Sequence, residues 1–289
     1  MQIGRRFRRL ASKSPRELIH AVRVSARYRA MVWRLRIPRI GNDRTAYILG
    51  LFGTGRWYII EQISQNIGER AKYFKDEIRF HPRPTSMIYS GHVTRKYISR
   101  GFEQPVTMTR ILEAVGLGFA DLVFVYRHPL DSLLTNWVFW RTIVREGRMV
   151  AGVTQMYRHA EELSAELERN FEEFKAFAQG DPRFYAGMSG PRFLSFAEFV
   201  EETELHLQSP GLMLRLEDFM FDPLKEFSRV AEILSPGLDM SRVRVARPRT
   251  EPYGYLAVRE RSSQFRKFIA ALDVESRRRI ERLGCPECF

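Results

Sequence analysis

A glycine-rich turn, Gly53-Thr54-Gly55-Arg56, is the part of this sequence best suited to bind an anion. An apolar run, Ala46 to Leu51, precedes the turn, and apolar residues from Tyr58 to Ile63 follow it at helical spacing. A strand, a tight turn and a helix in this order direct backbone N–H groups and the positive end of the helix dipole to one point. We expect Thr54 and Arg56 to add a hydroxyl and a charge-assisted hydrogen bond there.

Trp57 and Tyr58 open the expected helix and complete the set of candidate binding residues around the turn. The turn is not a Walker A sequence, because no Gly-Lys-Ser or Gly-Lys-Thr follows at the required spacing. A plain strand-to-helix connection is the alternative interpretation, since glycine-rich turns are common.

A second group of polar residues follows the apolar run Asp121 to Tyr126. Arg127 ends this run, Pro129 and Asp131 indicate the start of a helix, and Thr135 lies within that helix. A guanidinium that can bind in a bidentate manner, beside a hydroxyl on the following helix, can hold a phosphate.

The segment from Phe124 to Thr135 resembles the 3′-phosphate motif of sulfotransferases that use 3′-phosphoadenylyl sulfate, and we compare the chain with the bacterial carbohydrate sulfotransferases. The resemblance implies that Arg127 and Thr135 hold the 3′-phosphate. The turn at Gly53 is similar to the 5′-phosphosulfate loop of the same family. That family often has Lys or Arg where this chain has Gly53, so Arg56 becomes the candidate cation for the leaving phosphate.

His92 ends the segment Met87 to Gly91, which is similar to the region where many sulfotransferases carry a general base. At the end of a parallel strand, a histidine with a near-neutral pKa could take the proton of an acceptor alcohol. A loop histidine without a catalytic task is the alternative. The candidate catalytic residues are therefore His92, as the general base, and Arg56, which would stabilise the charge on the leaving phosphate.

Arg261 lies in a basic segment, residues 259–267, that is similar to the loop which closes over the nucleotide in this family. A solvated basic helix is the other interpretation. The acceptor is expected to be a hydroxyl compound, such as a glycan or glycolipid. Trp57, Trp137 and Trp140 are candidates for stacking on it, although such residues more often belong to the core.

The co-substrate implied by the resemblance is 3′-phosphoadenylyl sulfate, and no metal is required. Cys285 and Cys288 are the only cysteines and form half a zinc site at most. Their small number excludes a disulfide framework and fits a reducing compartment.

The net charge of +13 is concentrated in residues 1–40, where 12 Lys and Arg accompany one acid, Glu17. The remaining chain carries only +2, so a nucleic-acid partner is not expected. We expect two parts, a basic amphipathic arm over 1–40 and one sulfotransferase-like α/β domain over 41–289. The arm fits a solvated helix on the domain edge, a helix docked on an anionic membrane surface, or a mitochondrial transit peptide.

Apolar runs at 46–51, 87–89, 121–126 and 211–216 predict strands of a parallel sheet covered on both faces. Helices are predicted over 154–177, from Ser195, from Asp222 to Leu234, and from 273 to 283. The fold class is therefore α/β, a parallel sheet like that of P-loop NTPases with flanking helices and helical insertions.

No apolar run reaches the ~20 residues of a membrane-spanning helix, and the N-terminus has no secretory h-region. A cytoplasmic protein, peripheral at a membrane if the arm docks there, is therefore expected. Two other functions stay open: a nucleotide kinase on a P-loop-like fold, and a non-catalytic protein that docks on membranes through its arm.

Overall fold

The computed structural model describes a set of segments separated by gaps. They are residues 44–51, 53–67, 72–74, 86–94, 97–98, 112–113, 115–118, 121–145, 160–184, 193–246 and 255–284, together with 15 and 19. The basic arm, apart from those two residues, and both cysteines lie outside the described residues.

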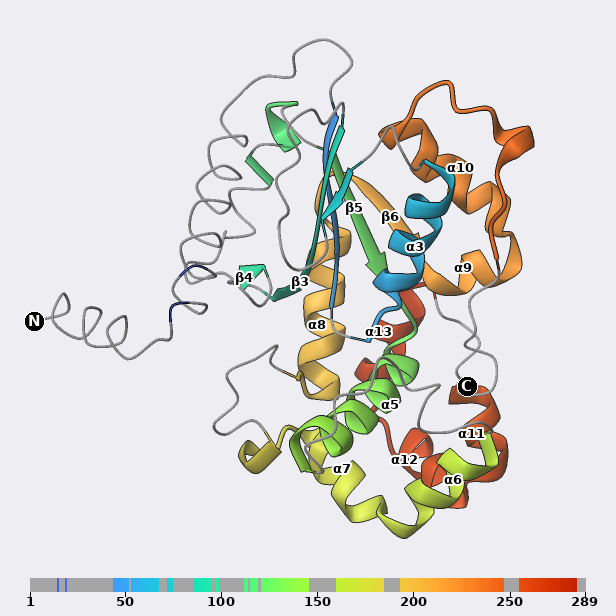
Figure 1. Cartoon of the computed structure of the whole chain (residues 1–289). Coiled ribbons are helices and arrows are strands. Elements are labelled where there is room, and N and C mark those ends of the chain that lie inside the picture. The colour runs from blue at the N-terminus through green and yellow to red at the C-terminus, as the bar shows by residue number, and fades with distance from the viewer. Residues whose placement is uncertain are drawn as a thin grey trace, which may run out of the picture.

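A parallel sheet forms the upper half of the molecule in Figure 1. Its strands follow the order β2-β3-β1-β5-β6, and β4 pairs antiparallel with β3. The first strand, β1, therefore lies between β3 and β5, and the strands that follow it in sequence are added on both of its sides. The predicted α/β class with a P-loop-like parallel sheet is confirmed. The strands are β1 (Arg44–Gly50), β2 (Lys72–Phe74), β3 (Ser86–Thr94), β4 (Tyr97–Ile98), β5 (Asp121–Tyr126) and β6 (Leu212–Arg215).

Helices cover both faces of the sheet, as its apolar strands require. On one face, α3 (Arg56–Asn66) and α10 (Pro223–Leu234) pack on alternate strand residues such as Val123 and Val125 (Figure 1). On the other face, α8 (Phe196–Leu207) contacts β5 through the rings of His206 and Phe124, whose centroids lie 4.9 Å apart.

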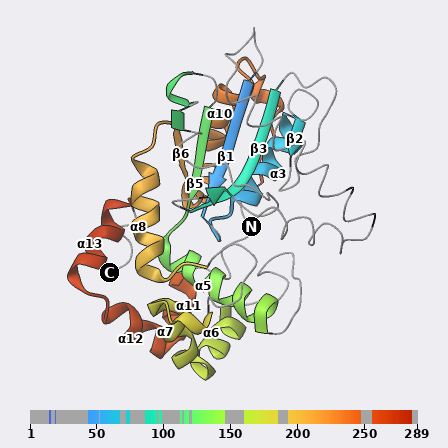
Figure 2. The ribbon, with the colours of Figure 1, turned by 90° about the vertical axis from the view of Figure 1, so that its left-hand side faces the viewer.

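A second apolar core lies beyond the carboxyl ends of the strands, below the sheet in Figures 1 and 2. Phe174, Phe177 and Phe265 are fully buried in it, and edge-to-face ring contacts join its helices. The helices of this core are α5 (Pro129–Phe139), α6 (Ala160–Arg169), α7 (Phe171–Gln179), α11 (Tyr255–Arg261), α12 (Ser263–Ala270) and α13 (Val274–Arg282), together with α8.

Several short elements complete the described chain. A six-residue helix, α9 (Leu216–Phe221), follows β6 directly, which the sequence analysis did not predict. The remaining elements are the π-helix η2 (Trp140–Arg145) and the 3-10 turns η4 (Pro182–Phe184) and η5 (Met240–Arg242). No described helix is both long enough and apolar enough to cross a bilayer.

The helix predicted over 154–177 is wrong as a single helix. Its described part is two helices, α6 and α7, separated at Asn170. The Asn170 amide donates hydrogen bonds to the carbonyl and the Oε1 of Glu166, and such local bonding competes with the helix. The break bends the apolar stripe around the second core.

The predicted helix starts are confirmed by their caps. Ser195 and Glu198 form both hydrogen bonds of a capping box on α8. Asp222 accepts the Lys225 N–H ahead of Pro223, and Asp273 accepts the Ser276 N–H at the start of α13. These short polar side chains satisfy N–H groups that have no partner within the helix.

Candidate anion-binding site at the carboxyl edge of the sheet

The register of the sheet brings three candidate segments to one edge. Gly50, the last residue of β1, pairs with His92 of β3 on one side and with Val125 of β5 on the other. The turn that follows Gly50 therefore lies beside the residues that follow Val125, which include Arg127. The backbone of His92 lies at the same edge, while its side chain is outside the described atoms. Open α/β sheets bind ligands at this kind of edge, where the chain turns to opposite sides.

The turn itself depends on glycine. Gly53 and Gly55 have φ values of 85° and 75°, in the left-handed region that L side chains rarely adopt. Gly55 is the N-cap of α3 and supplies no side-chain cap, so the first N–H groups of this eleven-residue helix are left without a capping side chain. This arrangement leaves the positive end of α3 available to an anion.

Two side chains of the turn are buried. The Thr54 hydroxyl donates a 2.9 Å hydrogen bond to the Leu51 carbonyl, so Thr54 closes the turn on itself. A hydrogen bond from this hydroxyl to a ligand would require that bond to break. Arg56 is only 2% exposed and begins α3, which places a cation beneath the turn.

Of the two aromatic residues that open α3, Tyr58 is the one whose side chain the structure describes. Only the backbone of Trp57 is described. The Tyr58 hydroxyl donates to the Ala246 carbonyl, and burial raises the pKa of Tyr58 to about 12. Further along α3, Gln62 and Asn66 also hydrogen-bond the backbone of residues 244–246. Tyr58 therefore anchors a peripheral segment along α3.

Arg127 and Thr135 meet as the sequence predicts. The Arg127 Nη1 donates a 3.3 Å hydrogen bond to the Thr135 Oγ1, which in turn donates to the Asp131 carbonyl at 2.8 Å. The guanidinium also lies 3.7 Å from the Asp131 carboxylate and 3.9 Å from that of Glu217. Arg127 is 7% exposed, so its orientation is set before any ligand arrives.

Glu217 is a residue of this cluster that was not among the candidate residues of the sequence analysis. Its Oε1 accepts the backbone N–H of His128 at 2.9 Å and faces the Arg127 Nε. Burial, and then the charge of Asp131, raise the pKa of Glu217, while Arg127 opposes the shift. The carboxylate thus ties α9 to the connection between β5 and α5.

His128 is the N-cap of α5. Its Nδ1 accepts the Leu130 N–H at 3.1 Å, which fixes the tautomer that leaves Nδ1 unprotonated. Burial, followed by the charges of Arg127 and Arg215, lowers the pKa of His128 to about 3. His128 is therefore neutral at physiological pH and adds no charge beside Arg127.

The helix α5 links the two candidate sites. Asp131 and Thr135, one turn apart, lie on the side that contacts Arg127. Ser132 and Asn136, shifted by one residue, lie on the side that contacts the turn. A Cβ added to Gly53 would fall 2.9 Å from the Asn136 Oδ1 and 3.2 Å from the Ser132 carbonyl. The sequence analysis did not predict this contact, because neither Ser132 nor Asn136 was among the candidate binding residues.

Arg261 is an exposed residue of α11, one of the helices that form the second core. Its guanidinium pairs with Glu161 at 2.7 Å, lies 3.6 Å from Glu260, and donates to the Ala257 carbonyl. Its neighbours Ser262 and Ser263 hydrogen-bond Glu168 of α6. These contacts join α11 and α12 to α6, and none of them reaches the turn at Gly53. A nucleotide contact by Arg261 stays a prediction.

Two of the aromatic residues considered for the acceptor lie in the second core. Trp137 is fully buried against Phe174, with their ring centroids 5.6 Å apart, and Arg141 lies over its ring. Trp140 contacts Phe184 at 4.6 Å. Their rings are thus occupied by protein contacts.

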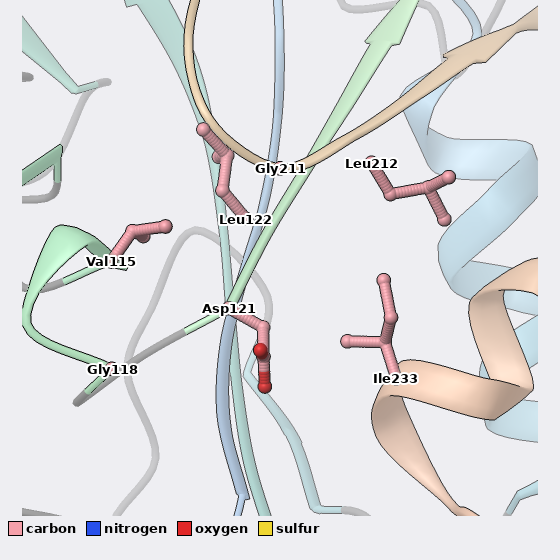
Figure 3. Close-up of a pocket in the computed structure, with 7 residues that line it drawn as sticks. All are labelled: Val115, Gly118, Asp121, Leu122, Gly211, Leu212 and Ile233. Atoms are coloured by element: carbon pink, nitrogen blue, oxygen red, sulfur yellow. The ribbon is translucent and has the colours of Figure 1, made fainter.

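A cavity of about 470 Å³ opens at the opposite edge of the sheet (Figure 3). Asp121 and Leu212, the first residues of β5 and β6, line it together with Ile233 of α10. Because it lies at the amino ends of these strands, it is separate from the candidate anion site.

Comparisons with known proteins do not place the chain in a family. No protein-family model matches it, and no curated protein matches it. Among solved structures it is similar to mouse sulfotransferase SULT7A1 complexed with PAP, with 12% sequence identity and a TM-score of 0.43. The similarity spans 87% of this chain and 86% of the mouse chain. Values this low carry no inference about activity, so the function has to be argued from the residues at the site.

Proposed function

We propose that this protein transfers a sulfuryl group from 3′-phosphoadenylyl sulfate to the hydroxyl group of an acceptor. The observation that carries the proposal is the pairing of two anion sites on neighbouring strands. One is the glycine turn after β1, and the other is Arg127 with Thr135 after β5. A nucleotide with anionic groups on both its 3′ and 5′ carbons has the chemistry to occupy both at once.

Each candidate residue has a defined role in this reaction. The N–H groups at the start of α3, together with Arg56, would hold the 5′-phosphosulfate and stabilise charge on the leaving phosphate. Arg127 and Thr135 would hold the 3′-phosphate. His92 would accept the proton of the acceptor hydroxyl.

The chemical step is a displacement at sulfur. The acceptor oxygen forms a bond to sulfur while the bond from sulfur to the 5′-phosphate oxygen breaks. The products are a sulfate ester and adenosine 3′,5′-bisphosphate, and the acceptor proton passes to His92. A glycan or glycolipid is the acceptor class we propose, and residues 1–40 would bring the enzyme to an anionic membrane surface.

Ligand-induced shifts of the melting temperature test this function. Adenosine 3′,5′-bisphosphate should stabilise the full chain more than ATP does, because only the bisphosphate has a group for Arg127. A larger shift with ATP would favour the kinase, and a response to anionic vesicles alone would favour a membrane-docking protein. Transfer of labelled sulfate to a panel of glycans would then identify the acceptor, and single-turnover kinetics of His92→Ala should show a slower chemical step.

A further inference from the structure

Two polar side chains of α5, the helix that contacts the glycine turn, are buried without a hydrogen-bonding partner among the described residues. Ser132 is fully buried and Asn136 is 1% exposed. No described residue forms a hydrogen bond with the Ser132 Oγ or the Asn136 Oδ1. Buried polar groups are nearly always hydrogen-bonded, because leaving one unsatisfied destabilises the protein. Two such groups one helical turn apart are therefore unusual.

Their position points to the turn at Gly53. The Asn136 Oδ1 is the atom nearest to where a Gly53 side chain would begin, at 2.9 Å, and the Ser132 carbonyl follows at 3.2 Å. Residues four apart lie on the same face of a helix, so the side chains of Ser132 and Asn136 share one face of α5. The Asn136 side chain and the Ser132 carbonyl are the parts of α5 that contact the turn. The N–H groups at the start of α3 lie on the other side of that turn.

We propose that Ser132 and Asn136 bind the same anionic group as the turn, and that this group is the 5′-phosphosulfate. The inference rests on the proposed function. The Ser132 hydroxyl can donate one hydrogen bond. Asn136 can donate through its amide nitrogen, because rotation of the carboxamide exchanges nitrogen and oxygen at nearly the same positions. Both groups are uncharged, so they add donors without changing the charge of the site.

This assignment divides α5 between the two ends of the nucleotide. Asp131 and Thr135 hold Arg127 for the 3′-phosphate, while Ser132 and Asn136 contact the 5′ end. One rigid helix would thus set the distance between the two anionic groups of the ligand. The helix would also supply hydrogen-bond donors beside Gly53, the position at which the sulfotransferase motif often has Lys or Arg.

Binding measurements with two half-ligands test the assignment. Adenosine 5′-phosphosulfate occupies only the turn, and adenosine 3′-monophosphate occupies only the Arg127 site. Asn136→Leu should lower the affinity for the first about tenfold and leave the second unchanged, because a hydrogen bond to a charged group is lost. Ser132→Ala should act in the same direction. Ser164→Ala is the matched control, since Ser164 is equally buried but hydrogen-bonds the Ala160 carbonyl within α6.

Stability separates a ligand-binding role from a packing role. Ser132→Ala removes an unsatisfied polar group without adding volume, so the melting temperature of the ligand-free protein should stay unchanged or rise. An affinity for adenosine 5′-phosphosulfate within twofold of wild type in both variants would overturn the inference. So would the absence of binding of adenosine 5′-phosphosulfate and inorganic pyrophosphate to the wild-type protein.

The same experiment distinguishes failure of the proposed function from failure of this inference. Inorganic pyrophosphate could bind in an Asn136-dependent manner while 3′-phosphoadenylyl sulfate does not bind. That result would support the anion site and contradict the sulfuryl-transfer function. If 3′-phosphoadenylyl sulfate binds equally to wild type and to both variants, the result would support the proposed function and contradict the role of Ser132 and Asn136 in binding.

Discussion

Arg127 is held in a fixed orientation by three neighbours, at the scale of single residues. Thr135 accepts its hydrogen bond, and the carboxylates of Asp131 and Glu217 lie within 4 Å of it. Both carboxylates would repel a phosphate at this point. Burial, and then the charge of Asp131, raise the pKa of Glu217, while the charge of Arg127 opposes the shift. The same two acidic groups that orient the guanidinium therefore oppose the binding of an anion at this position.

Arg127→Ala should abolish most of the binding energy at the 3′-phosphate site. We expect the affinity for adenosine 3′,5′-bisphosphate to fall at least tenfold, because charge-assisted hydrogen bonds contribute about 1.5–3 kcal/mol. Isothermal titration calorimetry measures the change. Arg242→Ala is the control, since the Arg242 side chain is 87% exposed and, among the described residues, its ion pair is with Asp239. Equal affinity in Arg127→Ala and Arg242→Ala would remove Arg127 from the site.

The Arg261→Ala variant should be compared with Arg127→Ala and Arg242→Ala for its affinity for adenosine 3′,5′-bisphosphate. If Arg261 binds the nucleotide as the sequence resemblance implies, its removal should weaken adenosine 3′,5′-bisphosphate binding in the same titration. If its contacts with Glu161 and the Ala257 carbonyl are its whole role, the affinity should equal that of Arg242→Ala. The sequence resemblance and the observed contacts therefore make opposite predictions.

At the scale of elements, the turn between β1 and α3 is the part of the site with the least room for change. Gly53 faces Asn136, and an added Cβ at Gly55 would fall 2.4 Å from the Leu216 Cδ2 of α9. The turn is thus enclosed by α5 on one side and by α9 on the other. Its conformation depends on glycine and on these packed neighbours together.

Gly53→Ala should destabilise the protein and weaken anion binding. A left-handed alanine costs about 1–2 kcal/mol, and the contact with Asn136 adds to this. Gly237→Ala is the matched control, because Gly237 has a φ of 81° and nothing within 4 Å of an added Cβ. Urea unfolding should show a larger loss for Gly53→Ala, and only that variant should lose affinity for adenosine 5′-phosphosulfate. Equal losses of stability in the two variants would mean that the Asn136 side chain moves away from the added Cβ without destabilising the protein.

For the whole molecule, α8 is the helix that joins the sheet to the second core. It contacts β5 through His206 and Phe124, and its residue Phe196 belongs to the core beyond the strands. His206 is 2% exposed, and burial lowers its pKa to about 4. Glu202 lies 3.6 Å from its Nε2, but burial dominates the shift. A titratable group therefore lies at the junction of the two halves.

The stability of the protein should fall as the pH decreases from 6.5 to 4. In this range the unfolded chain binds a proton at His206 that the folded chain does not, so protonation favours unfolding. The stabilisation is complete above pH 6.5, and up to about 3 kcal/mol is lost near pH 4. His128 acts in the same direction, because its pKa is also lowered.

His206→Phe tests this prediction. The phenyl ring keeps the contact with Phe124 and removes the titrating group. Thermal unfolding at pH 7.5 and pH 4.5 should show a smaller acid-induced decrease for His206→Phe than for the wild-type protein. Parallel decreases in the two proteins would assign the acid sensitivity to other groups.

Local signals in the sequence determined the elements and their ends. The apolar runs predicted β1, β5 and β6 closely, and the caps at Ser195 and Asp222 predicted two helix starts. Arg127 and Thr135 were identified through the resemblance of residues 124–135 to a sulfotransferase motif, which lies on one connection of the chain. Such features depend on neighbours in the chain, so composition and spacing report them.

Only the tertiary structure decided which residues from different segments meet. The contacts of Asn136 with Gly53, and of Glu217 with Arg127, join positions about 80 to 90 residues apart, and no spacing rule encodes them. The break at Asn170 was missed because the apolar stripe continues through it into the second core. The sequence by itself determined the glycine turn and the place of Arg127 after β5. The packing of α5 against both of them decided that they lie next to one helix.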